Sequence, residues 1–161
     1  MARIKTRDIT ESIASALQYI SYYHSPDFVK AMTRAYEREE SPAAKNAMAQ
    51  ILINSRLAAE GHRPICQDTG VVVVFLKIGQ SAVIDGDDSI QDAINDGVRR
   101  AYTNADNPLR ASMVSPPIGA RKNTGDNTPA VVHTEIVPGE CIEITIAAKG
   151  GGSENKARMT D

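Results

Sequence analysis

The feature that most constrains the fold is an uninterrupted apolar run, VVVVFL, at residues 71–76. Four consecutive valines followed by Phe and Leu leave no polar alternation, which favours a β-strand covered on both faces. The run is also far too short to cross a bilayer as a helix. We therefore expect a core strand here, extending into KIG at residues 77–79, and no transmembrane segment.

Three helices are predicted before this strand. In the first, apolar residues recur at helical spacing behind a possible cap pair of Asp8 and Glu11. The second and third open at Ser25 and Ser41, each followed by a proline that suits the first helical turn. Gly61 is placed to end the third helix. The apolar stripe of the first helix consists of Ile9, Ile13, Leu17 and Ile20.

After the core strand the pattern predicts one more helix, a long loop and two strands. The helix covers about Ser89–Tyr102, and residues 107–129 carry four of the chain's eight prolines. Strands are expected at 130–137 and 141–148, joined as a hairpin across 138–140. In the second strand three isoleucines face one way, and Cys141 shares the other face with Glu143 and Thr145. The predicted fold class is α+β, with N-terminal helices packed on a short mixed or antiparallel sheet that is incomplete at the C-terminus.

Length, charge and cysteine count exclude several classes. The 161 residues suit one domain, and a net charge of -2 offers no cationic surplus for nucleic acid or anionic lipid. Two cysteines cannot form a secreted disulfide framework, and the N-terminus lacks the apolar stretch of a signal peptide. These observations favour a cytoplasmic protein that binds neither nucleic acid nor a membrane.

The segment PICQDTG, residues 64–70, holds the residues most suited to chemistry. Cys66 could be a nucleophile assisted by His62, a metal ligand, or a small buried side chain. A zinc site of His62, Cys66 and Cys141 is weaker, because structural zinc sites show tight paired spacings that are absent here. Asp68 is either a turn former or a general acid-base group.

Two further segments could bind an anionic ligand. KGGGSENK, residues 149–156, follows a strand, so its glycines could bring backbone N–H groups close to an anion. The alternative is a flexible linker. Arg110, Arg121 and Lys122 surround the proline-rich loop, where an arginine could hold a carboxylate with two parallel hydrogen bonds.

Four segments taken together resemble the class I fumarate hydratases, which are iron-sulfur hydro-lyases. They also resemble the α-type region of two-subunit fumarases and tartrate dehydratases. The resemblance runs essentially from end to end of the chain, and four motifs in one order are more specific than any one of them. The segments are GHRPICQDTG at 61–70, LRASMVSPP at 109–117, RKNTGDNTPA at 121–130 and AAKGGGSENK at 147–156.

The resemblance implies a [4Fe-4S] cluster and a small dicarboxylate substrate. Cys66 would be one of three cysteine ligands, with one iron left open as the Lewis acid. Gln67 would hydrogen-bond to substrate and Asp68 would transfer a proton. Arg110 would hold a carboxylate, and the backbone at Gly152 would lie against the ligand.

In the family, the other two cluster cysteines and further active-site residues follow the KGGGSENK segment, and Cys141 matches no ligand position. Residues 1–161 are therefore expected to form the N-terminal part of the α-type catalytic domain, truncated before the later α-type region and the C-terminal β-type domain. The implied reaction is the reversible hydration of fumarate to L-malate, a step of the tricarboxylic acid cycle, with the isolated chain inactive. The alternatives are an L-tartrate dehydratase, or a non-catalytic remnant or subunit that needs a partner chain. The family also implies a homodimer or a complementary chain.

Overall fold

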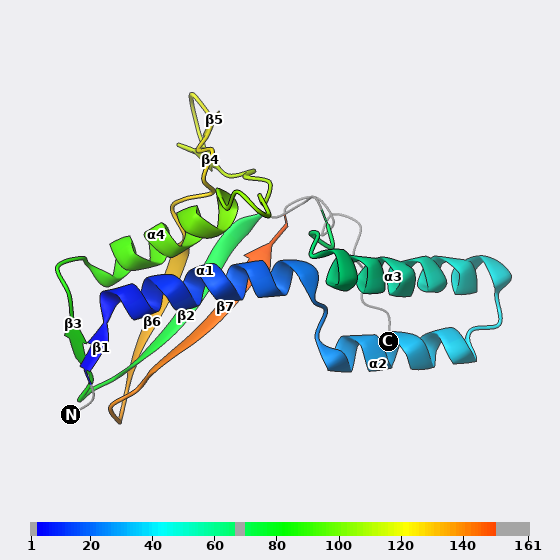
Figure 1. Ribbon diagram of the computed structural model, residues 1–161, viewed down its shortest axis with the longest axis horizontal. Coiled ribbons are helices and arrows are strands. Elements are labelled where there is room, and N and C mark those ends of the chain that lie inside the picture. The colour runs from blue at the N-terminus through cyan, green and yellow to red at the C-terminus, as the bar shows by residue number, and fades with distance from the viewer. Residues whose placement is uncertain (1–2, 67–69, 151–161) are drawn as a thin grey trace. The chain divides into compact units, whose positions relative to one another are not determined.

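The protein is described by a computed structural model that covers residues 3–66 and 70–150 (Figure 1). It confirms the α+β class, and the sheet is mixed. The chain divides into two compact units, which we describe separately. The sheet unit consists of the residues before Tyr19 together with those after Cys66, and the helical unit is Tyr19–Cys66. Helix α1 (Thr6–Tyr22) begins in the sheet unit and ends in the helical unit.

The apolar run forms the central strand of a three-stranded sheet with the order β6, β2, β7. Strand β2 (Val71–Gly79) pairs in parallel with β6 (Val131–Val137) and antiparallel with β7 (Ile142–Lys149). The parallel pair is possible because helix α4 (Ile90–Tyr102) lies in the long connection from β2 to β6. Both predicted strands after residue 130 are therefore confirmed.

The predicted hairpin between those two strands is wrong. β6 and β7 are not neighbours, because β2 lies between them. Their short connection passes around the end of β2, where Gly79 N donates to Cys141 O (2.8 Å) and Gln80 N donates to Val137 O (2.7 Å). A Cβ at Gly79 would lie 2.5 Å from Gly139 O, so the absence of a side chain at Gly79 lets the connection cross this closely.

Helices α1 and α4 cover one face of this sheet and form the core with it (Figure 1). The contact between them includes a buried hydrogen bond from Thr10 Oγ1 to Ala93 O (3.0 Å). Helix α4 begins at the predicted place, with the Ser89 hydroxyl accepting from Asp92 N (3.0 Å). The fully buried aliphatic side chains are Ile9, Ile13, Leu17, Val72, Val74, Leu76, Ile94 and Val98.

The expectation that β2 is covered on both faces is wrong for the described residues. Phe75 is 48% exposed, and Val131, which pairs with Val73 of β2, is also exposed. The Phe75 ring stacks on His133 at 5.1 Å between centroids, and Lys77 Nζ lies 3.0 Å from Glu143 Oε1. Burial therefore alternates along β2, although its sequence does not alternate between apolar and polar residues.

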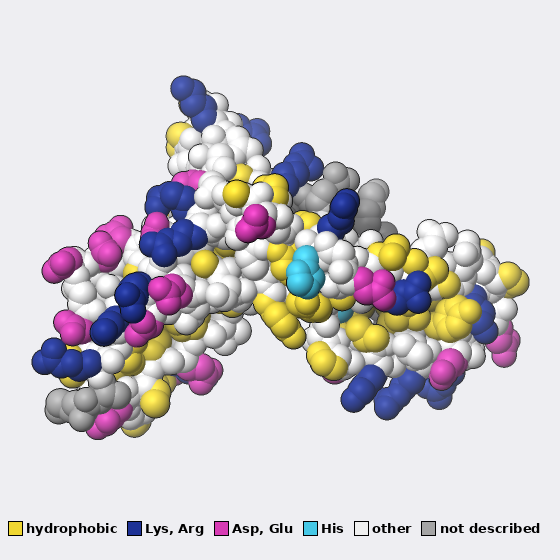
Figure 2. Space-filling model, in the orientation of Figure 1, with side chains coloured by type: hydrophobic (Ala, Val, Ile, Leu, Met, Phe, Trp, Pro, Cys, Tyr) yellow, Lys and Arg dark blue, Asp and Glu magenta, His cyan; other side chains and the backbone are white. Residues whose placement is uncertain are grey.

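The helical unit pairs α2 (Pro26–Arg38) with α3 (Pro42–Gly61), so both predicted serine-proline starts are confirmed. The Ser41 hydroxyl accepts from Ala44 N at 3.5 Å. His62 follows α3 with φ +45° and provides the left-handed cap, next to the glycine predicted to end the helix. Figure 2 shows hydrophobic side chains at the surface of this unit; the exposed ones include Ile51, Ile53 and Leu57.

Four short strands were not predicted. β1 (Arg3–Lys5) pairs in parallel with β3 (Val83–Asp85), and β4 (Val114–Ser115) pairs antiparallel with β5 (Lys122–Asn123). The second pair lies inside the long loop and joins two of the segments that resemble the fumarate hydratases. None of the helices in residues 3–66 and 70–150 is long and apolar enough to span a bilayer.

Candidate active site

Gly70 lies where two of the four segments meet. It is buried, has φ +55° and directly precedes β2. Because β7 runs antiparallel to β2, the end of β7 lies beside the start of β2, and Val71 pairs with Lys149. A Cβ at Gly70 would overlap the Lys149 carbonyl group and lie 2.5 Å from Gly150 Cα. Gly70 and the residues that open KGGGSENK are therefore packed backbone against backbone.

Asn127 attaches a third and a fourth segment at the same place. Its side chain is fully buried, at 0% exposure. The amide nitrogen Nδ2 donates to Gly70 O (2.8 Å), and Oδ1 accepts from Ser112 N (3.0 Å) and Met113 N (2.9 Å). We call Gly70, Ser112, Met113, Asn127 and Lys149 the Gly70 junction. The junction brings together parts of all four segments that carry the family resemblance.

The arginine segment, LRASMVSPP at residues 109–117, is also bound by two hydrogen bonds from residues 123 and 124. Asn123 Nδ2 donates to Ala111 O (2.8 Å), and Thr124 N donates to Met113 O (3.0 Å). Leu109 is 5% exposed and anchors the start of the segment, whereas Arg110 is exposed. Arg110 therefore extends from a backbone that is fixed on both sides of it. Such fixation lowers the entropy lost when a guanidinium binds a carboxylate.

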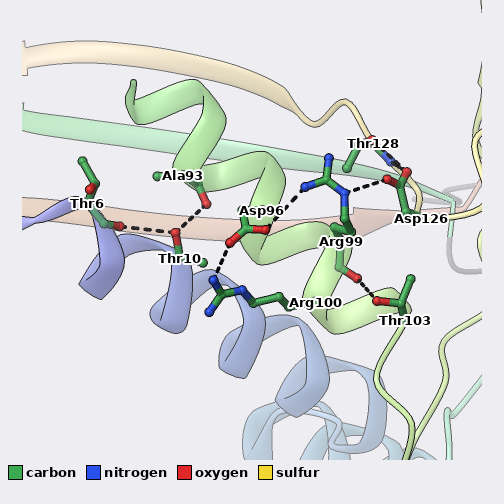
Figure 3. A network of polar contacts seen from close by, with 9 residues as sticks. All are labelled: Thr6, Thr10, Ala93, Asp96, Arg99, Arg100, Thr103, Asp126 and Thr128. Atoms are coloured by element: carbon green, nitrogen blue, oxygen red, sulfur yellow. Dashed lines mark hydrogen bonds and ion pairs between the residues drawn. The ribbon is translucent and has the colours of Figure 1, made fainter. Parts of the chain in front are cut away.

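Charge pairing fixes the turn that carries Asn127 (Figure 3). Asp126 accepts from Thr128 N (3.0 Å) and the Thr128 hydroxyl (2.7 Å), and Arg99 Nε lies 3.0 Å from Asp126 Oδ2. Partial burial acts to raise the pKa of Asp126, but the hydrogen bonds from Thr128 and Arg99 outweigh it and lower the pKa below its ordinary value of 3.8. Asp126 is therefore ionised near neutral pH and ties the turn to helix α4.

The predicted site residues fall in three places. Cys66 is exposed and is the last residue of the helical unit. Arg110 belongs to the sheet unit, next to the Gly70 junction in sequence. Gln67, Asp68 and Gly152 lie outside the described residues. Within the sheet unit, the structure brings together Gly70, Ser112 and Lys149, each within three residues of a predicted site residue in sequence. The roles assigned to the predicted site residues stay predictions.

Two alternatives for Cys66 can be compared with the structure. His62 Nε2 lies 3.1 Å from the Tyr23 hydroxyl, and its ring stacks on Tyr22 at 5.6 Å between centroids. These contacts give His62 a structural role at the end of α3. Within residues 3–66 and 70–150, no group of three or more His, Cys, Asp and Glu side chains is arranged to hold a metal ion. The zinc hypothesis therefore gains no support.

Sequence reasoning missed Asn127. It lies in the segment RKNTGDNTPA, which drew attention only for its charges and its resemblance. Its φ of +63° belongs to the left-handed region, which asparagine tolerates better than most residues. Asn between a Gly-Asp pair and Thr-Pro is a turn signal, but its three long-range hydrogen bonds have no signature in the sequence.

Comparisons of the sequence with known proteins match the chain to one family. The family model described as fumarate hydratase (Fumerase) matches residues 10–160. The chain is 40% identical over 122 residues to the aerobic class I fumarate hydratase of Escherichia coli, covering 75% of this chain and 22% of that protein. It is 33% identical over 146 residues to fumarate hydratase 2 of Leishmania major, covering 89% and 25%. The L(+)-tartrate dehydratase subunit alpha of Escherichia coli is 30% identical over 146 residues, covering 89% and 47%. The chain thus spans about half of the tartrate dehydratase subunit and about a quarter of the fumarate hydratases.

Proposed function

The chain belongs to the fumarate hydratase (Fumerase) family, and from that premise we propose that it is part of a hydro-lyase that interconverts fumarate and L-malate. We propose that the chain is the N-terminal portion of the α-type catalytic region. It covers 22% of the aerobic class I fumarate hydratase and 47% of the tartrate dehydratase subunit alpha. The reaction adds the oxygen of water to one alkene carbon and a proton to the other. It needs a polarised oxygen, a proton donor or acceptor, and cations that hold two carboxylates.

The observation that supports this proposal is the Gly70 junction. Four segments far apart in the sequence meet there through buried backbone contacts and the three hydrogen bonds of Asn127. Convergence of this kind is typical of a binding site built from loops on a rigid scaffold.

Each segment has a proposed role in that site. Arg110 binds one substrate carboxylate, because a guanidinium matches its two oxygens. Gln67 hydrogen-bonds to the substrate, and Asp68 transfers a proton on the cluster side of the substrate. The backbone at Gly152 approaches the ligand closely, where a side chain would interfere.

We also propose that Cys66 is one ligand of a [4Fe-4S] cluster. Iron-sulfur clusters are held by cysteine thiolates, and the exposed position of Cys66 leaves its sulfur accessible to such a group. The described residues do not complete a ligand set, so the other ligands must come from elsewhere in the enzyme. When bound, the cluster would supply Lewis acidity toward the substrate hydroxyl.

A second polypeptide or a longer chain is therefore part of the proposal. The relative named a subunit alpha implies a partner subunit in that protein. For this chain we propose either a homodimer of a longer polypeptide or a complex with a complementary chain. A cytoplasmic location fits two exposed thiols, because a reducing compartment keeps them reduced.

L-tartrate is the second candidate substrate, because tartrate dehydratase alpha subunits match at similar identity. Elimination of water from tartrate uses the same bond changes as malate dehydration with one additional hydroxyl.

The deciding experiment is a kinetic comparison on the protein isolated anaerobically from its native source, together with any chain that copurifies. We expect fumarate hydration with a kcat/KM at least tenfold above L-tartrate dehydration, and no turnover by the purified 161-residue chain alone. The reverse preference would establish the tartrate alternative. Absence of both activities from an iron-loaded preparation would contradict the proposal.

The cluster assignment has its own matched pair, Cys66→Ser and Cys141→Ser. Both side chains are exposed, so neither change disrupts a buried core. We expect Cys66→Ser to lower the iron and sulfide content of the isolated enzyme, and Cys141→Ser to leave both unchanged. Equal iron content in the two variants would remove Cys66 from the ligand set.

A further inference from the structure

The contacts of Asn127 differ from those of an ordinary turn residue. Its side chain is fully buried, and all three of its hydrogen bonds reach backbone groups outside its own turn. Two of them go to the segment that follows Arg110, and the third goes to the carbonyl of Gly70. A single side-chain amide thus spans the arginine segment and the CQDTG segment.

We propose that Asn127 is a positioning residue that fixes the segment bearing the carboxylate-binding arginine to Gly70, the last residue of the CQDTG segment. This inference rests on the proposed function for the identity of the reaction, and on geometry alone for the linkage. Asn127 itself touches no reacting atom in the proposed site. It acts through Gly70 on one side and through Ser112 and Met113 on the other.

The residues around Asn127 hold its backbone and side chain in one position. Neighbouring Asp126 is bound by the hydroxyl and N–H of Thr128 and paired with Arg99, which fixes the backbone on which Asn127 is mounted (Figure 3). The φ of +63° directs the side chain into the interior without a large cost for asparagine. Burial removes competing water, so each of the three bonds is expensive to break.

Two substitutions separate the role of the Nδ2 donor of Asn127 from that of its Oδ1 acceptor. In Asn127→Asp the carboxylate still accepts from Ser112 N and Met113 N, but it can no longer donate to Gly70 O. In Asn127→Gly both sets of bonds are lost, while the left-handed backbone remains unstrained. The first change therefore releases only the CQDTG side, and the second releases both sides.

These variants have distinct kinetic expectations in the native holoenzyme. Asn127→Asp should lower kcat about tenfold with KM changed less than threefold, because the attachment to Gly70 is lost while the hydrogen bonds to Ser112 and Met113 remain. Asn127→Gly should lower kcat by at least as much and also raise KM about tenfold. A purely structural role would lower the amount of folded enzyme and leave both constants of the folded fraction unchanged.

Asn104→Asp is the matched control. Asn104 also caps two backbone N–H groups through Oδ1, those of Asp106 (2.9 Å) and Asn107 (3.1 Å), in the loop after α4. Its substitution makes the same chemical change outside the Gly70 junction, and we expect kcat and KM within twofold of wild type. If Asn127→Asp behaves like Asn104→Asp, the inference is overturned.

Hydrogen exchange of the amides at 111–114 separates this inference from the proposed function. We expect at least tenfold faster exchange there in Asn127→Gly, and wild-type exchange in Asn127→Asp and Asn104→Asp. Wild-type exchange in Asn127→Gly would overturn the linkage whatever the enzyme's activity. An inactive wild type would instead overturn the proposed function, and faster exchange in Asn127→Gly would still support the linkage. If Asn127→Asp does not fold, Asn127→Gly tests both the kinetics and the linkage.

Discussion

Substitution of Gly70 by alanine tests the packing at the centre of the candidate site. The new Cβ would overlap the Lys149 carbonyl group and lie 2.5 Å from Gly150 Cα. Both obstacles are backbone atoms in or next to a strand, so no side-chain rotation can relieve the overlap. Either β7 must move away from the start of β2, or the chain at Gly70 must change its path.

Three contributions determine how far Gly70→Ala lowers the free energy of unfolding. Overpacking of this kind costs about 1–3 kcal/mol. A residue with a Cβ at φ +55° adds about 1–2 kcal/mol, because Gly70 lies in the left-handed region. Reduced freedom of the unfolded chain returns about 0.4–1 kcal/mol. We therefore expect Gly70→Ala to lower the free energy of unfolding by about 2–4 kcal/mol.

Gly125→Ala is the control, because Gly125 has φ +80° and a Cβ there would meet nothing within 4 Å. Gly125→Ala measures the cost of a side chain at positive φ without an overlap of the new Cβ with backbone atoms. Urea unfolding followed by circular dichroism should place Gly70→Ala at least 1 kcal/mol below Gly125→Ala. Equal losses in the two variants would refute the close approach of Gly70 to β7.

Other positions give independent checks. Asp126→Asn should cost about 1–2 kcal/mol in urea unfolding, because it weakens the bonds to Thr128 and the pairing with Arg99. Since the pKa of Asp126 is lowered in the folded state, its contribution is complete above 3.8 and is lost as the pH falls below that value. The free energy of unfolding should therefore fall less steeply with decreasing pH below 3.8 in Asp126→Asn than in wild type. Identical slopes would contradict the lowered pKa of Asp126. Ser89→Ala should cost about 1 kcal/mol through loss of the cap of α4, whereas an unchanged midpoint would show that the cap contributes nothing.

Local signals predicted the starts of α2, α3 and α4, but the cap pair of Asp8 and Glu11 is wrong, because α1 already begins at Thr6. Ser25-Pro26 and Ser41-Pro42 start helices where expected, and Ser89 caps the fourth. These signals succeed because the energetics of a helix start involve only a few consecutive residues. The strand positions at 71–79, 131–137 and 142–149 also follow from β-branched composition and flanking turn residues.

Strand pairing and strand environment were less predictable. The connection between β6 and β7 is short enough for a hairpin, and the sequence carries no sign that β2 lies between them. That arrangement depends on the fit of Gly79 against Gly139, which are 60 residues apart. Likewise, the apolar residues of β2 indicate burial on both faces, but exposure depends on which elements are present to cover each face.

In the candidate site, too, some residues could be identified from the sequence and others only from the structure. Cys66 and Arg110 were singled out because their side chains carry recognisable chemistry. Asn127 was not, because an asparagine in a turn is common and its importance comes from three contacts across more than a dozen residues each. Residues that act by position alone require the structure.

The most direct test of the whole account is the fumarate hydration rate of the native holoenzyme carrying Arg110→Lys, compared with Arg121→Lys. Lysine keeps the positive charge but cannot bind a carboxylate with two parallel bonds from one planar group. We predict that kcat/KM falls about 10- to 100-fold for Arg110→Lys and less than twofold for Arg121→Lys. Equal rates in the two variants would place the dicarboxylate site elsewhere and contradict the account.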